Sequence, residues 1–302
     1  MRFLFVDRII KLNEGKSICG IKNITHDDAF LDNSFSKPNF YFSIVGETLG
    51  QLAAWNIMQH SDFKLRPVAG IFASIRFYRP AFVGETLFLE ANIDSLQENA
   101  ANYHGKAYVN GELVLSLDNA LAPMLPMETF IDSTLVRDQF NQIYRPLSAH
   151  SSPTSRSHDL IADNPAIKSW ERDVGKNAPP YFQFDQINSL VKNQEIIATK
   201  SISLAFAYFL DHFPKKPVLP LSVLIECTHN LTKFFMSQSD IRGFRLAEIS
   251  KVKIRDFIQP GDHIICHLKL KSQDSNQLIF QATIILDDKK IGIFFLTFIK
   301  EA

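Results

Sequence analysis

The sequence repeats itself, and this repeat limits the possible folds more than any other feature. The segment 32–38 (DNSFSKP) matches the segment 211–217 (DHFPKKP) at an offset of 179 residues, and Glu47 stands opposite Glu226 at the same offset. Other pairs keep this order at offsets of 177 to 179 residues: Asp7 and Asp185, Lys22 and Lys200, Ser43 and Ser222, Gly84 and Gly261. An ordered repeat of this extent predicts two similar structural units in one chain.

The length of the chain agrees with this division. Its 302 residues are enough for two domains of about 150 residues, each with its own core. We predict a first domain over residues 1–131, a linker over 132–180 and a second domain over 181–302. The predicted linker is rich in serine, proline and charged residues, and short helices are expected within it at 135–144 and 166–172.

The two copies share one order of elements. A strand-like start is followed by a loop with proline and then by an apolar helix, at 43–58 in the first copy and 222–236 in the second. The helices are apolar nearly all round, which is typical of buried helices, and Ser43 and Ser222 are expected to cap them. Segments of alternating apolar and polar residues follow: 73–77, 86–93, 103–109 and 113–120, then 251–255, 263–270, 278–286 and 291–298. This alternation predicts antiparallel strands, so the expected fold class is α+β, with a sheet wrapped around a central helix in each copy.

Composition argues against several classes of protein. Lysine plus arginine number 32, as do aspartate plus glutamate, so the neutral chain has no overall field that would attract nucleic acid or an anionic membrane. No stretch approaches the roughly 20 apolar residues that span a bilayer, and charges interrupt the N-terminal segment too early for a signal peptide. The three cysteines match neither a disulfide framework nor a zinc motif. We therefore expect a cytoplasmic protein that holds no metal.

The segment 211–226 (DHFPKKPVLPLSVLIE) resembles the active-site signature of the bacterial 3-hydroxyacyl-acyl-carrier-protein dehydratases of the FabA and FabZ type. That signature contains His-Phe-Pro, further prolines, and an acidic residue fourteen positions after the histidine, as Glu226 is after His212. The segments 3–9 (FLFVDRI) and 253–262 (KIRDFIQPGD) are similar to other parts of these enzymes. The resemblance implies two tandem hot-dog domains that form a pseudo-dimer within one chain. It also implies acyl carrier protein as the partner that brings the substrate.

In this family, the histidine of one subunit faces the acidic residue of the other. Carried over to this sequence, the resemblance implies a catalytic pair of His212 and Glu47. A second site would combine Glu226 with Asn33, which stands at the histidine position of the first copy. An asparagine amide does not accept a proton from carbon near neutral pH. We therefore expect one working site and one degenerate site in each chain.

The expected chemistry is the elimination of water from a 3-hydroxyacyl thioester. It needs a base for the C2 proton, which suits histidine, and an acid for the C3 hydroxyl, which suits a buried carboxyl group with a raised pKa. The family binds the thioester oxygen to a backbone N–H at a helix start, five residues before the acid. Phe42 holds that position before Glu47, and Leu221 holds it before Glu226. The reaction requires no metal and no organic cofactor.

Other interpretations stay open. The same fold also supports hydratases and thioesterases, and hydration is the reverse of the expected reaction. The sequence lacks the glycine that precedes the family's histidine, which is compatible with a non-catalytic protein that binds acyl thioesters or acts as a scaffold. Glu47 and Glu226 would then be buried carboxylates paired with basic residues.

A basic cluster is either a docking surface for acidic carrier protein or a solvated strand face: Lys215, Lys216, Arg242, Arg245, Lys251, Lys253 and Arg255. The sequence also leaves open whether the chain forms a homo-oligomer.

Overall fold

The structure is a computed structural model, and it describes residues 3–33, 37–68, 70–146 and 179–301. The strands of the first half are β1 (Arg8–Asn13), β2 (Ser17–Asn23), β3 (Leu31–Asp32), β4 (Asn39–Phe40), β5 (Leu65–Pro67), β6 (Ile71–Phe77), β7 (Ala81–Phe82), β8 (Thr86–Leu96), β9 (Ala100–Val109) and β10 (Glu112–Pro126). Those of the second half are β11 (Gln186–Val191), β12 (Glu195–Ser201), β13 (Phe244–Ile254), β14 (His263–Gln273), β15 (Gln277–Leu286) and β16 (Lys289–Lys300). The helices are α1 (Phe42–His60), α2 (Ser133–Ile143) and α3 (Leu221–Gln238).

The long strands form one continuous antiparallel sheet. Its order is β1-β2-β8-β9-β10-β6-β13-β16-β15-β14-β12-β11, and β5 pairs with β10. Counted outward from the middle of the sheet, equivalent strands follow in the same order in the two halves. The halves meet edge to edge at β6 and β13. Ile75 stands opposite Ile249 in this junction. The chain therefore has the predicted α+β fold, with two tandem hot-dog units joined as a pseudo-dimer.

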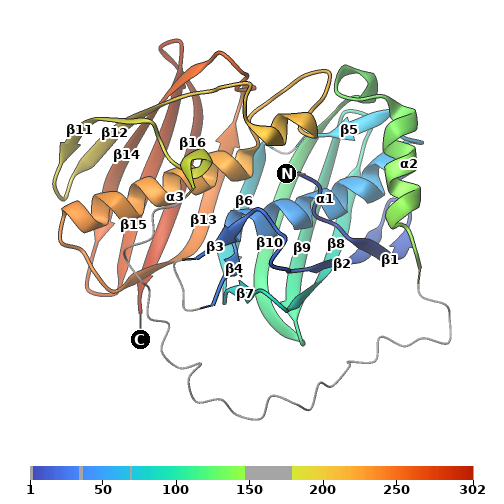
Figure 1. Cartoon of the computed structure of the whole chain (residues 1–302), viewed down its shortest axis with the longest axis horizontal. Helices are drawn as coiled ribbons and strands as arrows, with labels where there is room; N and C mark the ends of the chain where they lie inside the picture. Colours follow the sequence, from blue (N-terminus) through green and yellow to red (C-terminus); the bar gives the residue numbers. More distant parts are fainter. Residues whose placement is uncertain (1–2, 34–36, 69, 147–178, 302) are drawn as a thin grey trace.

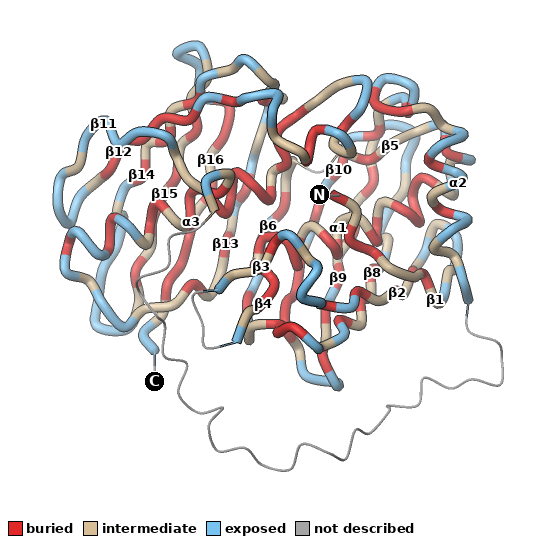
Figure 2. The backbone as a smooth tube through the Cα atoms, viewed as in Figure 1, coloured by how far each residue is buried: buried red, intermediate tan, exposed pale blue. Residues whose placement is uncertain are grey.

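Helices α1 and α3 lie on the same face of the sheet and contact each other (Figure 1). Both are buried around most of their circumference, while the outer strand β11 is largely exposed (Figure 2). A helix surrounded by sheet and by a second helix needs apolar residues on every side, which explains the uniformly apolar sequences. Within the described residues, no helix combines the length and apolar character needed to cross a membrane.

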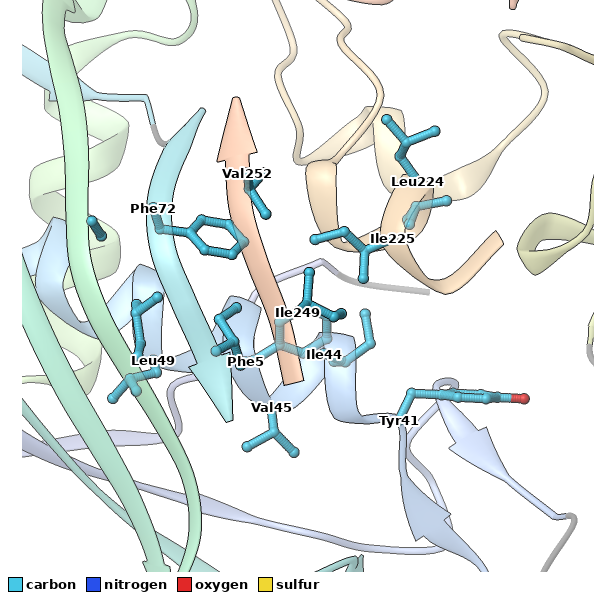
Figure 3. Packing of buried hydrophobic residues seen from close by; sticks show 14 of the residues in the cluster. Phe5, Tyr41, Ile44, Val45, Leu49, Phe72, Leu224, Ile225, Ile249 and Val252 are labelled. Atoms are coloured by element: carbon cyan, nitrogen blue, oxygen red, sulfur yellow. The ribbon is translucent and has the colours of Figure 1, made fainter. Parts of the chain in front are cut away.

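The junction of the two halves is packed with side chains from four elements. Phe72 of β6, Val252 of β13, Ile44 of α1 and Ile225 of α3 lie together in one buried cluster (Figure 3). Ile44 and Val252 are fully buried. Because this core is shared, each half covers apolar surface that the other half would expose alone.

Two local predictions need correction. Ser43 and Ser222 do not cap their helices, because each helix begins one residue earlier, after Tyr41 and Pro220, without a side-chain cap hydrogen bond. A proline ring, or a residue in the same extended conformation, is enough to direct the chain into the first turn. The two serine hydroxyls are instead directed toward the other half of the molecule.

Part of the predicted linker has a regular structure. Helix α2 forms where a helix was predicted, and its Phe140 packs on Trp55 and Phe63 with ring centroids 6.1 and 5.4 Å apart. Its N-cap is Asp132, whose carboxylate accepts a hydrogen bond from the backbone N–H of Thr134. The other predicted helix, 166–172, lies outside the described residues. The domain boundaries themselves stay a prediction.

Candidate active site

A cavity of about 590 Å³ lies where the two halves meet, and both halves supply its walls. The first half contributes one side of α1 together with β5 and β6. The second half contributes the loop around His212, the first turn of α3 and residues 254–258. Both His212 and Glu47 line this cavity, whereas Glu226 and Asn33 are not among its lining residues.

The cavity follows one stripe of α1. The lining residues recur at intervals of three and four, as one face of a helix requires: Ser43, Gly46, Glu47, Gly50, Gln51, Ala54, Trp55 and Met58. Two glycines in this stripe leave space beside Glu47. A Cβ atom on Gly50 would meet the Tyr103 hydroxyl at 3.6 Å, so any larger side chain there would extend into the cavity. The corresponding positions in α3 carry Ile225 and His229.

Glu47 is held by hydrogen bonds from both halves. The Ser222 hydroxyl donates to its Oε2 at 3.0 Å, and the Gln51 amide donates to its Oε1 at 3.0 Å. The same amide group of Gln51 is fixed by the backbone of Phe3 and Phe5. Burial raises the pKa of Glu47, although Gln51, Ser222 and the charge of Arg66 act in the opposite direction. The environment therefore favours the protonated carboxyl group relative to an exposed glutamate.

His212 has a defined tautomer. Its Nδ1 lies 3.0 Å from the carbonyl oxygen of Val218, and a carbonyl oxygen only accepts, so Nδ1 carries the proton and Nε2 is left with a lone pair. Burial lowers the pKa of His212 to about 4; the Val218 carbonyl partly opposes this, and the nearby charge of Arg66 adds to it. At neutral pH the imidazole is uncharged and its Nε2 is able to accept a proton.

Glu226, the repeat partner of Glu47, lies in a different environment. It accepts a hydrogen bond from Ser43 at 2.8 Å and contacts His229 Nδ1 at 3.0 Å. Burial alone would raise its pKa, but His229, Lys233 and Ser43 together lower it, so this carboxylate is charged. The Tyr41 ring is buried and packs on Phe182. Burial raises the pKa of Tyr41, and the charge of Glu226 adds to this shift.

Asn33, the predicted relic of a second histidine, is exposed. It therefore does not share a buried pocket with Glu226, which is 2% exposed. The structure brings together His212 and Glu47 but not Asn33 and Glu226.

The first residue of α3 lines the cavity, whereas the first residue of α1 does not. Leu221 and Ser222 line it, whereas Phe42 does not and instead packs its ring on Phe77 at 4.9 Å. Of the two positions that match the family's backbone donor, Leu221 therefore lies at the cavity and Phe42 does not. The first N–H groups of a helix have no partner within the helix, and its dipole favours negative charge at that end.

Three polar residues of the site were not assigned a role from the sequence. Ser222 was expected to cap a helix, and Arg66 and Tyr103 were not singled out, although all three line the cavity. Arg66 belongs to the short strand β5, and Tyr103 is one of several aromatic residues in alternating strands, so neither stands in a recognisable motif. In the described part of the chain, no group of three or more His, Cys, Asp or Glu side chains has the arrangement of a metal site, and all three cysteines are free.

Comparison with known proteins agrees with the motif. A family model described as ApeI-like, ApeI dehydratase, matches residues 188–291. The 3-hydroxyacyl-[acyl-carrier-protein] dehydratase FabZ of Caldanaerobacter subterraneus subsp. tengcongensis is 36% identical over 120 residues, which are 38% of this chain and 84% of that protein. The chain belongs to the FabZ dehydratase family. The FabZ match covers little more than one third of the chain. The rest of this FabZ-family protein is long enough for one further unit of similar size.

Solved structures match nearly the whole chain of this FabZ-family protein. A putative oleoyl thioesterase from Lactobacillus plantarum superimposes with a TM-score of 0.57 and 11% identity, covering 95% of this chain and 97% of that one. A protein of unknown function with a hot dog fold from Alicyclobacillus acidocaldarius gives a TM-score of 0.51 and 10% identity, covering 99% and 98%. At these identities the likeness concerns the fold, which confirms the hot-dog prediction over both halves.

Proposed function

We propose that this protein dehydrates 3-hydroxyacyl thioesters to trans-2-enoyl thioesters. The observation that supports the proposal is that His212 and Glu47, from opposite halves, both line one cavity. Their protonation states support the proposal, since an uncharged imidazole and a carboxyl group with a raised pKa are the base and the acid that elimination requires.

In the proposed reaction, His212 and Glu47 carry out both proton transfers. Nε2 of His212 removes a proton from C2, and the electron pair of that C–H bond becomes the double bond between C2 and C3. The C3–O bond breaks, and the departing hydroxyl takes the proton of Glu47 and leaves as water. The imidazolium and the carboxylate are left as a charge pair, and transfer of one proton from His212 to Glu47 restores the site.

Negative charge develops on the thioester oxygen as the C2 proton leaves. In the proposed mechanism the backbone N–H of Leu221, at the start of α3, donates to this oxygen. The side chain at this position does not affect the donor, which explains how leucine can stand where the family has glycine.

We propose acyl carrier protein as the carrier of the substrate. The support is the name of the FabZ relative, a 3-hydroxyacyl-[acyl-carrier-protein] dehydratase, together with the mainly apolar wall of the cavity. The apolar side chains Ala54, Trp55 and Met58 continue the α1 stripe beyond Glu47, and they are suited to an acyl chain.

The test is the turnover of a 3-hydroxyacyl thioester by the full chain and by His212→Ala. Enoyl product is expected from the wild type, with a loss of at least about 1,000-fold in the variant, because removal of a general base with its positioning is of this order. The matched control is His263→Ala, which removes an exposed histidine outside the cavity and should keep wild-type turnover. Tight binding of the acyl thioester without turnover by the wild type would contradict the proposal and assign the protein to the acyl-binding class.

A further inference from the structure

Arg66 places a positive charge in the cavity that the dehydration chemistry described above does not use. It lies on β5, and its guanidinium carbon is 4.0 Å from the ring centroid of Phe213. The Phe213 ring in turn stacks on the His212 imidazole, with centroids 4.1 Å apart. One aromatic ring therefore contacts both the proposed base and this guanidinium.

The guanidinium lacks acceptors within the described chain. Its Nε is buried and makes no hydrogen bond there, and Nη1 only approaches the Met58 sulfur at 3.9 Å. A thioether sulfur is a weak acceptor. No ion pair of Arg66 with a carboxylate is found among the described residues. Burial lowers the pKa of Arg66 to about 10, with the charge of Glu47 opposing this shift, so the group stays charged at neutral pH.

The Arg66 side chain is half-buried, and its buried Nε–H is costly to leave without an acceptor unless another molecule provides one. Stacking on Phe213 offsets part of this cost, but a ring face does not satisfy in-plane N–H donors. The cavity itself is the open space next to Arg66, which lines it together with His212 and Glu47. The missing acceptors are therefore expected on the molecule that occupies the cavity.

We infer that Arg66 is a substrate-binding residue whose guanidinium hydrogen-bonds an oxygen of the bound acyl thioester. The inference rests on the proposed function for the identity of the ligand. Two oxygens have the required chemistry: the thioester oxygen, which gains negative charge as C2 loses its proton, and a carboxylate or keto oxygen further along the acyl chain. Either contact explains why a charged guanidinium group lies in a mainly apolar cavity.

The experiment compares Arg66→Met and Arg66→Lys with the wild type on two substrates. One is a 3-hydroxyacyl thioester with a methyl end, and the other has the same chain length and ends in a carboxylate. Methionine keeps a similar length beside Phe213 but has no donor, while lysine keeps the charge without the planar fork. The matched control is Lys64→Met, which removes the same charge from an exposed neighbour outside the cavity.

Loss of a charged hydrogen bond is expected to lower activity of Arg66→Met about 10- to 100-fold, with a smaller loss in Arg66→Lys. A lower kcat on both substrates supports contact with the thioester oxygen. A lower kcat/KM on the carboxylate-ended substrate alone, with a wild-type preference for it, supports contact with the chain. The inference is overturned if both variants stay within about threefold of Lys64→Met on both substrates. Equal losses in both variants with equally lowered Tm would overturn it too, because Arg66 would then serve the fold.

Binding separates this inference from the proposed function. A saturated acyl thioester without the 3-hydroxyl cannot be dehydrated, and its Kd can be measured by calorimetry with the full chain. Tighter binding by the wild type than by Arg66→Met, by about tenfold or more, supports the role of Arg66 even if no turnover is found. Equal Kd values, together with unchanged turnover, overturn it even if the dehydratase activity is present.

Discussion

Glu47 and Glu226 occupy equivalent positions in the two copies of the repeat, yet their surroundings differ. Each accepts a hydrogen bond from a serine of the opposite half, Ser222 for Glu47 and Ser43 for Glu226. Burial raises the pKa of Glu47, whereas at Glu226 burial is outweighed by His229, Lys233 and Ser43 together, which lower the pKa. Burial favours the protonated form of Glu47, whereas Glu226 is a charged member of a buried cluster.

The difference comes from the residues one turn further along each helix. Gly50 follows Glu47 by three positions and leaves open space, while His229 follows Glu226 by three positions and fills that space. Duplication supplied the same carboxyl group twice, and small changes around it separated a candidate reaction site from a structural pair. A buried charge close to a partner is stabilised, but it is also unavailable to a substrate.

The sharpest way to break this comparison is to neutralise each acid in turn. Glu47→Gln is expected to slow the dehydration of a 3-hydroxyacyl thioester by about 1,000-fold or more, because the amide cannot donate the proton that the leaving hydroxyl needs. Glu226→Gln, the matched control, should keep activity within about fivefold once its own Tm is taken into account. If both variants are equally folded and lose comparable dehydration activity, the two carboxyl groups do not have different roles.

Filling the space beside Glu47 would make the first site resemble the second. Gly50→His is expected to lower kcat/KM about 100-fold, because the side chain enters the cavity near the Tyr103 hydroxyl, 3.6 Å from the position of its Cβ. Gly50→Ala is the control: it should keep most activity and raise the free energy of unfolding by about 0.5–1 kcal/mol, since alanine favours a helix. Full activity of Gly50→His would show that this space is not used by the substrate.

Removing His229 from the second site tests whether Glu226 and His229 form a pair that stabilises the fold. His229→Leu leaves the Glu226 carboxylate buried without its histidine partner, and we expect the free energy of unfolding to fall by about 3 kcal/mol. Denaturant unfolding measures this change, and Glu226→Gln together with His229→Leu should recover part of it as a coupling energy. Turnover per folded molecule should remain near the wild-type value, because neither residue lines the cavity.

The smallest expected effect is that of mild acid on the working site. Because the pKa of His212 is lowered to about 4, the imidazole stays neutral, and protonation of His212 should lower kcat/KM less than about twofold between pH 7 and pH 5. An unperturbed histidine would lose about 25-fold over the same range. Below about pH 4 activity falls as His212 is protonated, and on the alkaline side it falls as Glu47 loses its proton at its raised pKa. A pH profile of kcat/KM distinguishes a His212 with a lowered pKa from an unperturbed histidine.

Much of the fold follows from patterns that are local in the sequence. The apolar segments predicted as helices at 43–58 and 222–236 lie within α1 and α3, and each alternating segment lies in or across the end of a strand. Burial of one face or of all faces leaves a periodic trace in the sequence, so these elements could be predicted without knowing their neighbours. The role of the first serine of each helix was predicted wrongly, because the Ser43 and Ser222 hydroxyls donate to carboxyl groups of the opposite half.

For the candidate site, the sequence determined the motif around His212, the acidic residue opposite it in the repeat, and the asparagine that replaced a second histidine. Only the tertiary structure decided that Leu221 rather than Phe42 lies at the cavity, that Glu226 is paired with His229, and that Arg66 faces the same space as His212. The physical reason is that chemical type and spacing are properties of one segment. Which side chains share a cavity depends instead on the joining of β6 to β13, and this brings together residues far apart in the chain.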